Sequence, residues 1–237
     1  MEIKNTILQV ELTNHCNGNC PWCENSRMKR QKGFMNLDSA KQIIEKIKDR
    51  QNYVFLHFYG EPLLHPQLIE IIELFYQNGI NTGLYTNGQL LTDRMINALA
   101  ESNLRDIFIS MNRFNPRRQV EKLREKSNLN ITVVILNLPK KFPNKLKAIE
   151  LSKWVDKVKK ETDKDIRIQA QGYENPKTKE CCFKNKKGEC FFRKNNQYWV
   201  LWNGDLITCL KDHEGETKVG TFKDLDKVKY KNNLCPF

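Results

Sequence analysis

The sequence predicts an α/β protein built on a parallel sheet. Short runs rich in Ile, Val, Phe and Tyr alternate with amphipathic helical patterns, the alternation ends near residue 172, and the last quarter of the chain has a strand–turn–strand pattern. Parallel strands need crossovers between them, so repeated strand–helix units indicate a parallel sheet. Six such strands predict a partial (β/α)6, TIM-like barrel, followed by a small C-terminal β-hairpin and helix.

The six expected strands lie in the first part of the chain. Each is enriched in the β-branched and aromatic residues that favour strands. In parallel α/β sheets ligands collect at the carboxyl ends of the strands, so we expect the chemistry in the loops that follow them. The strands are expected at Ile7–Leu12, Tyr53–Phe58, Thr82–Tyr85, Asp106–Met111, Ile131–Leu136 and Ile166–Ala170.

Amphipathic helical patterns fill most gaps between these strands. Asn36 precedes the first helix and Thr92 begins the third, and both side chains can cap a helix N-terminus. The helices are expected at Leu37–Arg50, Gln67–Gln77, Thr92–Glu101, Pro116–Lys126 and Leu146–Lys159.

The change of pattern predicts one domain of residues 1–172 and a second of residues 173–237. The turn Asn203-Gly204-Asp205 supplies the positive φ angles of a tight hairpin. The polar stretch, the two strands and the closing helix of the second domain are expected at Glu174–Lys187, Gln197–Trp202, Leu206–Leu210 and Phe222–Tyr230.

Composition excludes several classes of protein. Of the 237 residues 39% are hydrophobic, and no apolar run is long enough to cross a bilayer, which excludes membrane spans, collagen and wholesale disorder. The first residues lack a charged and apolar leader, so a cytoplasmic protein without a membrane partner is expected. The net charge of +12 indicates either solvated basic faces or attraction to an anionic molecule. No nucleic-acid-binding module accompanies it, so nucleic acid is not an expected partner.

The eight cysteines form two groups separated by a long cysteine-free stretch. A cytoplasmic chain keeps its thiols reduced, so clusters of this kind indicate metal ligation in preference to disulfides. The cysteines are Cys16, Cys20, Cys23, Cys181, Cys182, Cys190, Cys209 and Cys235.

The first group lies in a loop directly after the first expected strand. The spacing of Cys16, Cys20 and Cys23 lets three thiolates bind one inorganic cluster. Four thiolates would close an iron–sulfur cubane, whereas three leave one metal open to a substrate or cofactor. A zinc site completed by His15 and an incidental loop remain alternatives.

This Cys-x3-Cys-x2-Cys loop, with Trp22 before its last cysteine, resembles the signature of the radical S-adenosylmethionine (SAM) superfamily. The resemblance implies that Cys16, Cys20 and Cys23 hold a 4Fe–4S cluster whose fourth iron binds SAM. It also implies that reductive cleavage of SAM gives methionine and a 5′-deoxyadenosyl radical.

Other segments match the superfamily at expected strand ends. Tyr59-Gly60-Glu61-Pro62 resembles its Gly-Gly-Glu-Pro motif, with Tyr59 in place of the first glycine. Gly60 would let the backbone approach the methionine ammonium group, and Glu61 would accept its hydrogens. The resemblance implies cofactor binding by Tyr59, Gly60, Glu61, Pro62, Asn87, Ser110, Asn112 and Leu136.

The second group resembles the auxiliary-cluster extension called SPASM, or its shorter form, twitch. Cys190, Gly204 and Cys209 have the spacing of its opening hairpin. Cys235 would supply a third ligand and either Cys181 or Cys182 a fourth, which implies one auxiliary 4Fe–4S cluster. Four thiolates also satisfy zinc, so a zinc knuckle remains an alternative.

These features together predict a radical SAM oxidoreductase. The expected substrate is a small polar molecule, aminocyclitol or sugar-like, and the auxiliary cluster would accept an electron from its radical. The tail differs from that of aminocyclitol-oxidising twitch enzymes, because only Cys235 follows Cys209. Modification of a ribosomally made peptide is an alternative, and a zinc-stabilised, basic RNA-binding protein is a remote one. A flavodoxin or ferredoxin is expected as the reducing partner.

Overall fold

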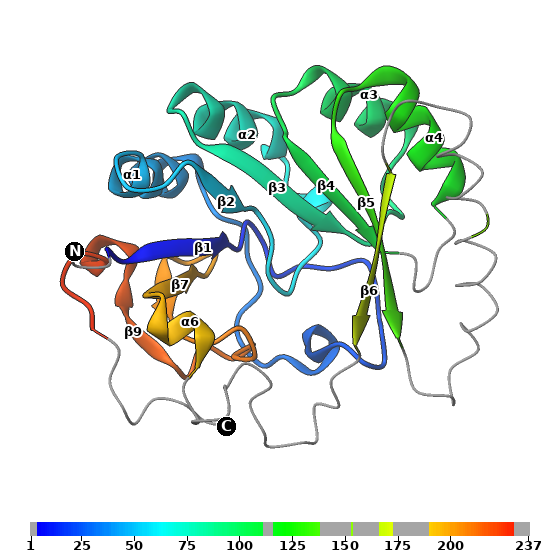
Figure 1. Ribbon diagram of the computed structural model, residues 1–237. Helices are drawn as coiled ribbons and strands as arrows, with labels where there is room; N and C mark the ends of the chain where they lie inside the picture. The colour runs from blue at the N-terminus through cyan, green and yellow to red at the C-terminus, as the bar shows by residue number, and fades with distance from the viewer. Residues whose placement is uncertain (1–3, 111–115, 138–152, 154–165, 173–189, 230–237) are drawn as a thin grey trace. The chain divides into compact units, whose positions relative to one another are not determined.

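The computed structural model describes residues 4–110, 116–137, 153, 166–172 and 190–229 (Figure 1). The chain forms two compact units. The first contains Met1–Thr82 and Pro176–Phe237, and the second contains Gly83–Asn175.

The sheet of the first unit joins the two ends of the chain. Strand β1 (Thr6–Val10) pairs in parallel with β2 (Tyr53–Phe55) on one side and with β7 (Gln197–Val200) on the other. Strands β8 (Asp205–Ile207) and β9 (Lys218–Thr221) continue the sheet in antiparallel order. Figure 1 shows the orange and red C-terminal strands beside the blue first strand.

Helix α1 (Leu37–Ile47) of this unit begins where the sequence predicts a cap, and α1 and α2 (Leu68–Gln77) bury apolar faces. In α1 the side chain of Asn36 accepts a hydrogen bond from the backbone N–H of Ser39 at 2.7 Å. The apolar face of α2 is fully buried at Ile71, Ile72 and Phe75, which stabilises the helix by removing apolar surface from water. A single turn, α6 (Phe191–Lys194), leads into β7.

The second unit is a parallel sheet covered by helices. Strands β3 (Asn81–Thr86), β4 (Asp106–Ser110), β5 (Asn130–Asn137) and β6 (Ile166–Gly172) pair in that order.

Helices α3 (Asp93–Glu101) and α4 (Arg117–Lys126) lie side by side in this unit (Figure 1). They are joined by an ion pair of Lys122 with Asp93 at 2.5 Å and by a hydrogen bond from Lys126 to Asn97 at 2.6 Å. Thr92 caps α3 by accepting from the N–H of Met95 at 3.3 Å.

The predicted α/β class, the six parallel strands and the C-terminal hairpin are confirmed. Gly204 has the expected positive φ, +88°, whereas Asn203 does not, because β7 ends at Val200 and the turn takes up residues 201–204. The second strand ends at Phe55, because the chain bends into its loop before the expected end at Phe58. The expected helix Leu146–Lys159 lies, apart from Lys153, outside the described residues.

The prediction of a closing helix at Phe222–Tyr230 is wrong over the part that the structure describes, which ends at Lys229. The structure has a short 3₁₀ helix, Phe222–Asp224, preceded by strand β9, which the sequence analysis missed. Thr221 and Asp224 cap each other's backbone N–H groups, which fixes this start, and the helix ends after one turn. The division into domains at residue 172 remains a prediction.

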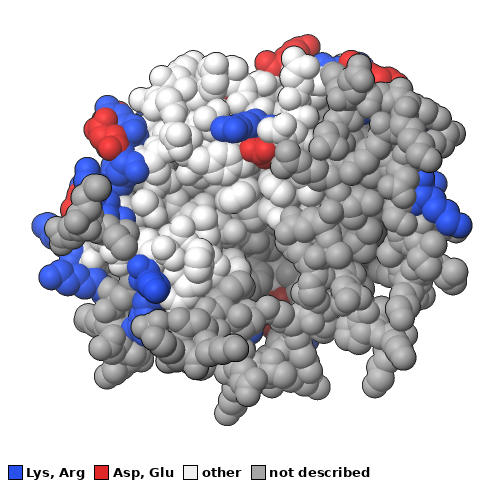
Figure 2. Space-filling view, viewed as in Figure 1, with Lys and Arg blue, Asp and Glu red and all other residues white. Residues whose placement is uncertain are grey.

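No helix in the described part of the chain is both long and apolar enough to cross a bilayer. On the face shown in Figure 2, the described Lys and Arg side chains form separate groups, without one continuous basic patch.

Candidate functional site

The N-terminal cysteine loop connects β1 to a short 3₁₀ helix, Glu24–Arg27. Cys16, Cys20 and Cys23 are partly exposed. The N–H of Gly18 donates to Sγ of Cys16 at 3.3 Å, and the N–H of Cys23 donates to the carbonyl of Cys20 at 3.0 Å. Burial raises the pKa of Cys23 most, the backbone N–H of Asn25 lowers it, and the nearby thiolates of Cys20 and Cys16 raise it.

The donor set fits an iron–sulfur cluster better than a single ion. Among the described residues no three His, Cys, Asp or Glu side chains converge closely enough to bind one metal ion. A zinc ion needs ligands about 2 Å from a common point, whereas a cubane is wider and takes thiolates that stand further apart. The ring of His15 stacks on Phe34 with centroids 4.7 Å apart.

Asn25 fixes the cysteine loop to the Tyr59–Pro62 segment. Its buried side-chain amide donates to the carbonyl oxygens of Asn14 and Tyr59, both at 2.8 Å. The N–H of Glu61 donates to the carbonyl of His15 at 2.8 Å. The two loops after β1 and β2 are therefore joined through their backbones.

Gly60 is needed for this junction for a steric reason. A Cβ atom at Gly60 would lie 2.0 Å from the carbonyl oxygen of Thr13, so no larger residue fits. The buried side chain of Glu61 accepts the N–H of Leu63 at 3.0 Å and caps the 3₁₀ helix that starts at Pro62. Contacts of Tyr59, Gly60, Glu61 and Pro62 with SAM remain predictions.

Lys32 places a positive charge at the cysteine loop. Its Nζ donates to the carbonyl of Asn14 at 2.9 Å, and to the carbonyl and side-chain oxygens of Asn25 at 3.2 and 3.0 Å. Burial and the charge of Arg30 lower the pKa of Lys32, while the thiolates of Cys16 and Cys23 act in the opposite direction. The ammonium group is therefore within electrostatic reach of two expected cluster ligands.

Three more expected cofactor-binding residues lie at or near the ends of strands in the second unit. Asn87 follows β3 and accepts the N–H of Gln89 with its side chain at 2.9 Å. Ser110 ends β4, and Leu136 is the penultimate residue of β5. Asn112 lies outside the described residues. The strand-end placement agrees with the expectation, and their binding of SAM remains a prediction.

The second cysteine group is partly described. Cys190 precedes α6 and Cys209 follows β8, and both are partly exposed. Their neighbours Phe192 and Leu210 pack against the same buried cluster, formed by Trp199, Leu201 and Ile207. Cys181, Cys182 and Cys235 lie outside the described residues.

Tyr59 joins the N-terminal cysteine loop to the segment that follows Cys209. Burial raises the pKa of its phenol, and the thiolates of Cys23 and Cys209 raise it further. The hydroxyl donates to the carbonyl of Leu210 at 3.4 Å, and the ring meets the edge of His213 with centroids 5.8 Å apart. Tyr59 therefore contacts the C-terminal segment directly, in addition to its place in the expected SAM motif.

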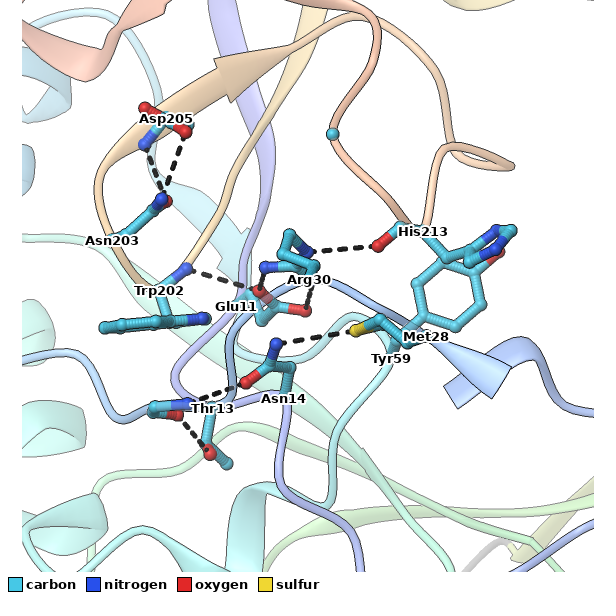
Figure 3. Close-up of polar contacts among 12 residues, drawn as sticks. Glu11, Thr13, Asn14, Met28, Arg30, Tyr59, Trp202, Asn203, Asp205 and His213 are labelled. Atoms are coloured by element: carbon cyan, nitrogen blue, oxygen red, sulfur yellow. Dashed lines mark hydrogen bonds and ion pairs between the residues drawn. The ribbon is translucent and has the colours of Figure 1, made fainter. Parts of the chain in front are cut away.

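The sequence analysis missed a buried ion pair beside the site (Figure 3). Arg30 binds both carboxylate oxygens of Glu11, at 2.7 and 2.8 Å, and its Nε donates to the carbonyl of His213 at 3.0 Å. Glu11 is fully buried and also accepts the N–H of Trp202 at 3.3 Å. The sequence signal for this ion pair was a charged residue, Glu11, inside the expected strand Ile7–Leu12.

Glu214 is a second residue that the sequence did not reveal. Its carboxylate accepts the N–H groups of Lys29 and Arg30, each at 2.9 Å. Trp202 lies over Gly33, where a Cβ atom would be 2.4 Å from the indole. The segment after the cysteine loop is thus held by the C-terminal hairpin and the turn that follows it.

Comparison with known proteins identifies the family. The model of the radical SAM superfamily matches residues 10–143, more than half of the chain. The S-adenosyl-L-methionine-dependent 2-deoxy-scyllo-inosamine dehydrogenase of Niallia circulans is 30% identical over 110 residues, which are 44% of this chain and 44% of that protein. The chain spans less than half the length of the curated relatives that it matches first.

Solved structures share the fold. BtrN in complex with AdoMet and 2-DOIA has a TM-score of 0.65 at 18% identity, covering 99% of this chain and 85% of BtrN. Streptococcus suis SuiB bound to the precursor peptide SuiA has a TM-score of 0.65 at 15% identity, covering 98% of this chain and 66% of SuiB.

Proposed function

This chain belongs to the radical SAM superfamily and is an enzyme, and from that membership we propose that it oxidises a small polar substrate of the aminocyclitol or sugar-like class. Its family implies a 4Fe–4S cluster and SAM. When bound and reduced by one electron, this pair supplies methionine and a 5′-deoxyadenosyl radical that removes a hydrogen atom from the substrate.

The chain's own residues would hold and orient these groups. Cys16, Cys20 and Cys23 would bind the cluster, and Asn25 would keep their loop against the Tyr59–Pro62 segment, where SAM is expected. The positive charge of Lys32 favours the thiolate forms of the ligands. Asn87, Ser110, Asn112 and Leu136 would complete the SAM site from the strand ends of the second unit.

One observation carries the choice of oxidation. The Tyr59 hydroxyl donates to the carbonyl of Leu210, next to Cys209, and the thiolates of Cys23 and Cys209 both raise the pKa of the Tyr59 phenol. After loss of a hydrogen atom, the substrate must lose one proton and one electron to complete a two-electron oxidation. An auxiliary 4Fe–4S cluster, bound by Cys190, Cys209, Cys235 and either Cys181 or Cys182, would accept that electron. A flavodoxin or ferredoxin would provide the electron that starts each SAM cleavage.

Modification of a ribosomally made peptide is the second candidate. SuiB, which was crystallised with its precursor peptide, shares the fold over nearly the whole of this chain. Incubation with aminocyclitols, sugars and peptide candidates, with 5′-deoxyadenosine measured in each, separates the two. Product formation from peptides alone would reject oxidation of a small polar molecule.

The test of the cofactors uses anaerobically reconstituted protein. Two clusters predict about eight irons and broad absorption near 400 nm. Cys16→Ala should abolish SAM cleavage. Cys209→Ala should retain SAM cleavage and lose substrate oxidation. Gln31→Ala, at an exposed position of the segment that follows the cysteine loop, is the matched control and should behave as wild type. Full product formation by Cys209→Ala would reject the acceptor role of the second group.

A further inference from the structure

We propose that Lys32 is a positioning residue that joins the two ends of the N-terminal cysteine loop, and so holds its three thiols ready for their cluster and slows loss of the cluster. The inference rests on one part of the proposed function, the binding of a cluster by Cys16, Cys20 and Cys23. It is independent of the substrate and of the second cysteine group.

The ammonium group of Lys32 binds residues on both sides of the cysteine loop. Asn14 comes two residues before Cys16, and Asn25 comes two residues after Cys23. Nζ of Lys32 donates to the carbonyl of Asn14 at 2.9 Å, and to the side-chain and carbonyl oxygens of Asn25 at 3.0 and 3.2 Å. These three oxygens match the three N–H donors of an ammonium group. Both asparagines are buried, so without Lys32 their oxygens would lose hydrogen bonds that water cannot fully replace.

Asn14 also fixes the backbone on either side of Lys32. Its side-chain amide donates to the carbonyl of Gln31 at 2.8 Å, and its side-chain oxygen accepts the N–H of Gly33 at 2.9 Å. Figure 3 shows the same amide directed at Sδ of Met28, at 3.4 Å. The backbone from which the Lys32 side chain extends is therefore bound to the same residue that its ammonium group binds.

The segment that carries Lys32 is attached to the chain that leaves β1. The N–H of Met35 donates to the carbonyl of Leu12 at 2.8 Å, and the hydroxyl of Thr13 donates to the carbonyl of Gly33 at 2.7 Å. Lys32 therefore ties the cysteine loop to a segment that is itself held beside the end of the first strand.

The charge of Lys32 suits a loop that carries thiolates. Burial and the charge of Arg30 lower the pKa of Lys32, whereas the thiolates of Cys16 and Cys23 raise it. Thiolates on one loop repel one another, and a positive charge bound to both loop ends offsets part of that repulsion. A loop already held in its binding conformation also loses less conformational entropy when it binds. Both effects predict that the cluster is retained longer with Lys32 than without it.

Hydrogen exchange of the reconstituted full chain tests the joining of the loop ends. Lys32→Met should speed exchange of residues 14–25 roughly tenfold and leave exchange in α1 unchanged, since it removes hydrogen bonds from a charged group at the loop alone. Lys29→Met is the matched control, because it removes the same charge from an exposed position of the same segment. Wild-type exchange of residues 14–25 in Lys32→Met, or equal acceleration in Lys29→Met, would overturn the proposal.

Release of iron to an excess of chelator, under anaerobic conditions, tests the effect on the cluster. A Cys209→Ala background keeps the second cysteine group from contributing iron. In that background Lys32→Met should release iron roughly tenfold faster and alter the paramagnetic resonance spectrum of the reduced cluster, whereas Lys29→Met should change neither. Background behaviour of Lys32→Met in either measurement would overturn its role in holding the cluster. A wild type that takes up no iron would overturn the proposed cluster itself, and hydrogen exchange would still decide whether Lys32 joins the loop ends.

Discussion

Gly60 and Thr13 meet so closely that a Cβ atom on Gly60 would lie 2.0 Å from the carbonyl oxygen of Thr13. This contact is between two backbones, so neither partner can move aside as a side chain would. It brings the loop after β2 against the loop that carries the three N-terminal cysteines.

Gly60→Ala is therefore expected to separate the two loops. The methyl group must displace backbone, which predicts a loss of stability of about 1–3 kcal/mol and at least tenfold weaker SAM binding. Calorimetry and SAM titration of the reconstituted enzyme measure the two effects. Gly79→Ala is the control: it has φ of +75° but open space around it, so it should cost about 1 kcal/mol and leave SAM binding unchanged. Wild-type SAM affinity in Gly60→Ala would contradict the prediction.

Arg30→Met is expected to leave the buried carboxylate of Glu11 without its partner. Loss of one member of a buried ion pair costs about 3–5 kcal/mol, which denaturant unfolding can measure. The double variant Glu11→Gln/Arg30→Met should recover a substantial part of that loss, because no unpaired charge remains. A double variant as unstable as the sum of the two single variants would show that the pair is not coupled.

Lys32→Met is expected to make the midpoint potential of the N-terminal cluster more negative. Reduction adds an electron to a group already surrounded by thiolates, and Lys32 is a positive charge that stabilises the added one. A redox titration followed by paramagnetic resonance measures the shift. Lys29→Met, at an exposed position of the same segment, should shift it much less. An equal shift in the two variants would indicate a general charge effect and argue against a specific role for Lys32.

His57 predicts a pH dependence of stability. Burial lowers the pKa of its imidazole from 6.5 to about 3. Between these values the unfolded chain binds a proton that the folded chain does not. The folded state is therefore favoured fully above pH 6.5 and loses this contribution as the pH falls toward 3.

The His57→Gln variant should lose this acid sensitivity. Between pH 8 and 5.5 the wild type should lose stability relative to the variant by up to about 1.4 kcal/mol per pH unit below 6.5, measured by urea unfolding. Gln9, whose Nε2 lies 3.4 Å from Nε2 of His57, offers a control in Gln9→Ala, which should keep the acid sensitivity. Parallel pH profiles for wild type and His57→Gln would contradict the assignment.

Local patterns predicted much of the fold and part of the site. Strand–helix alternation identified the six parallel strands, and the capping roles of Asn36 and Thr92 depend only on neighbouring residues. The contacts of Arg30 with Glu11 and of Glu214 with Lys29 are different, because each joins distant segments that meet only after folding. Strand β9 escaped prediction because it is short and contains Gly220 with φ of +155°.

The parallel pairing of β1 with β7 has a consequence for biosynthesis. Thr6 lies opposite Gln197, so about 190 residues must leave the ribosome before the free edge of the first strand is covered. Until then that edge can bind other strands. A cluster assembled on the adjacent cysteines at this stage would be bound to an incompletely folded sheet. We expect nascent chains arrested before residue 197 to depend on chaperones more than released ones do.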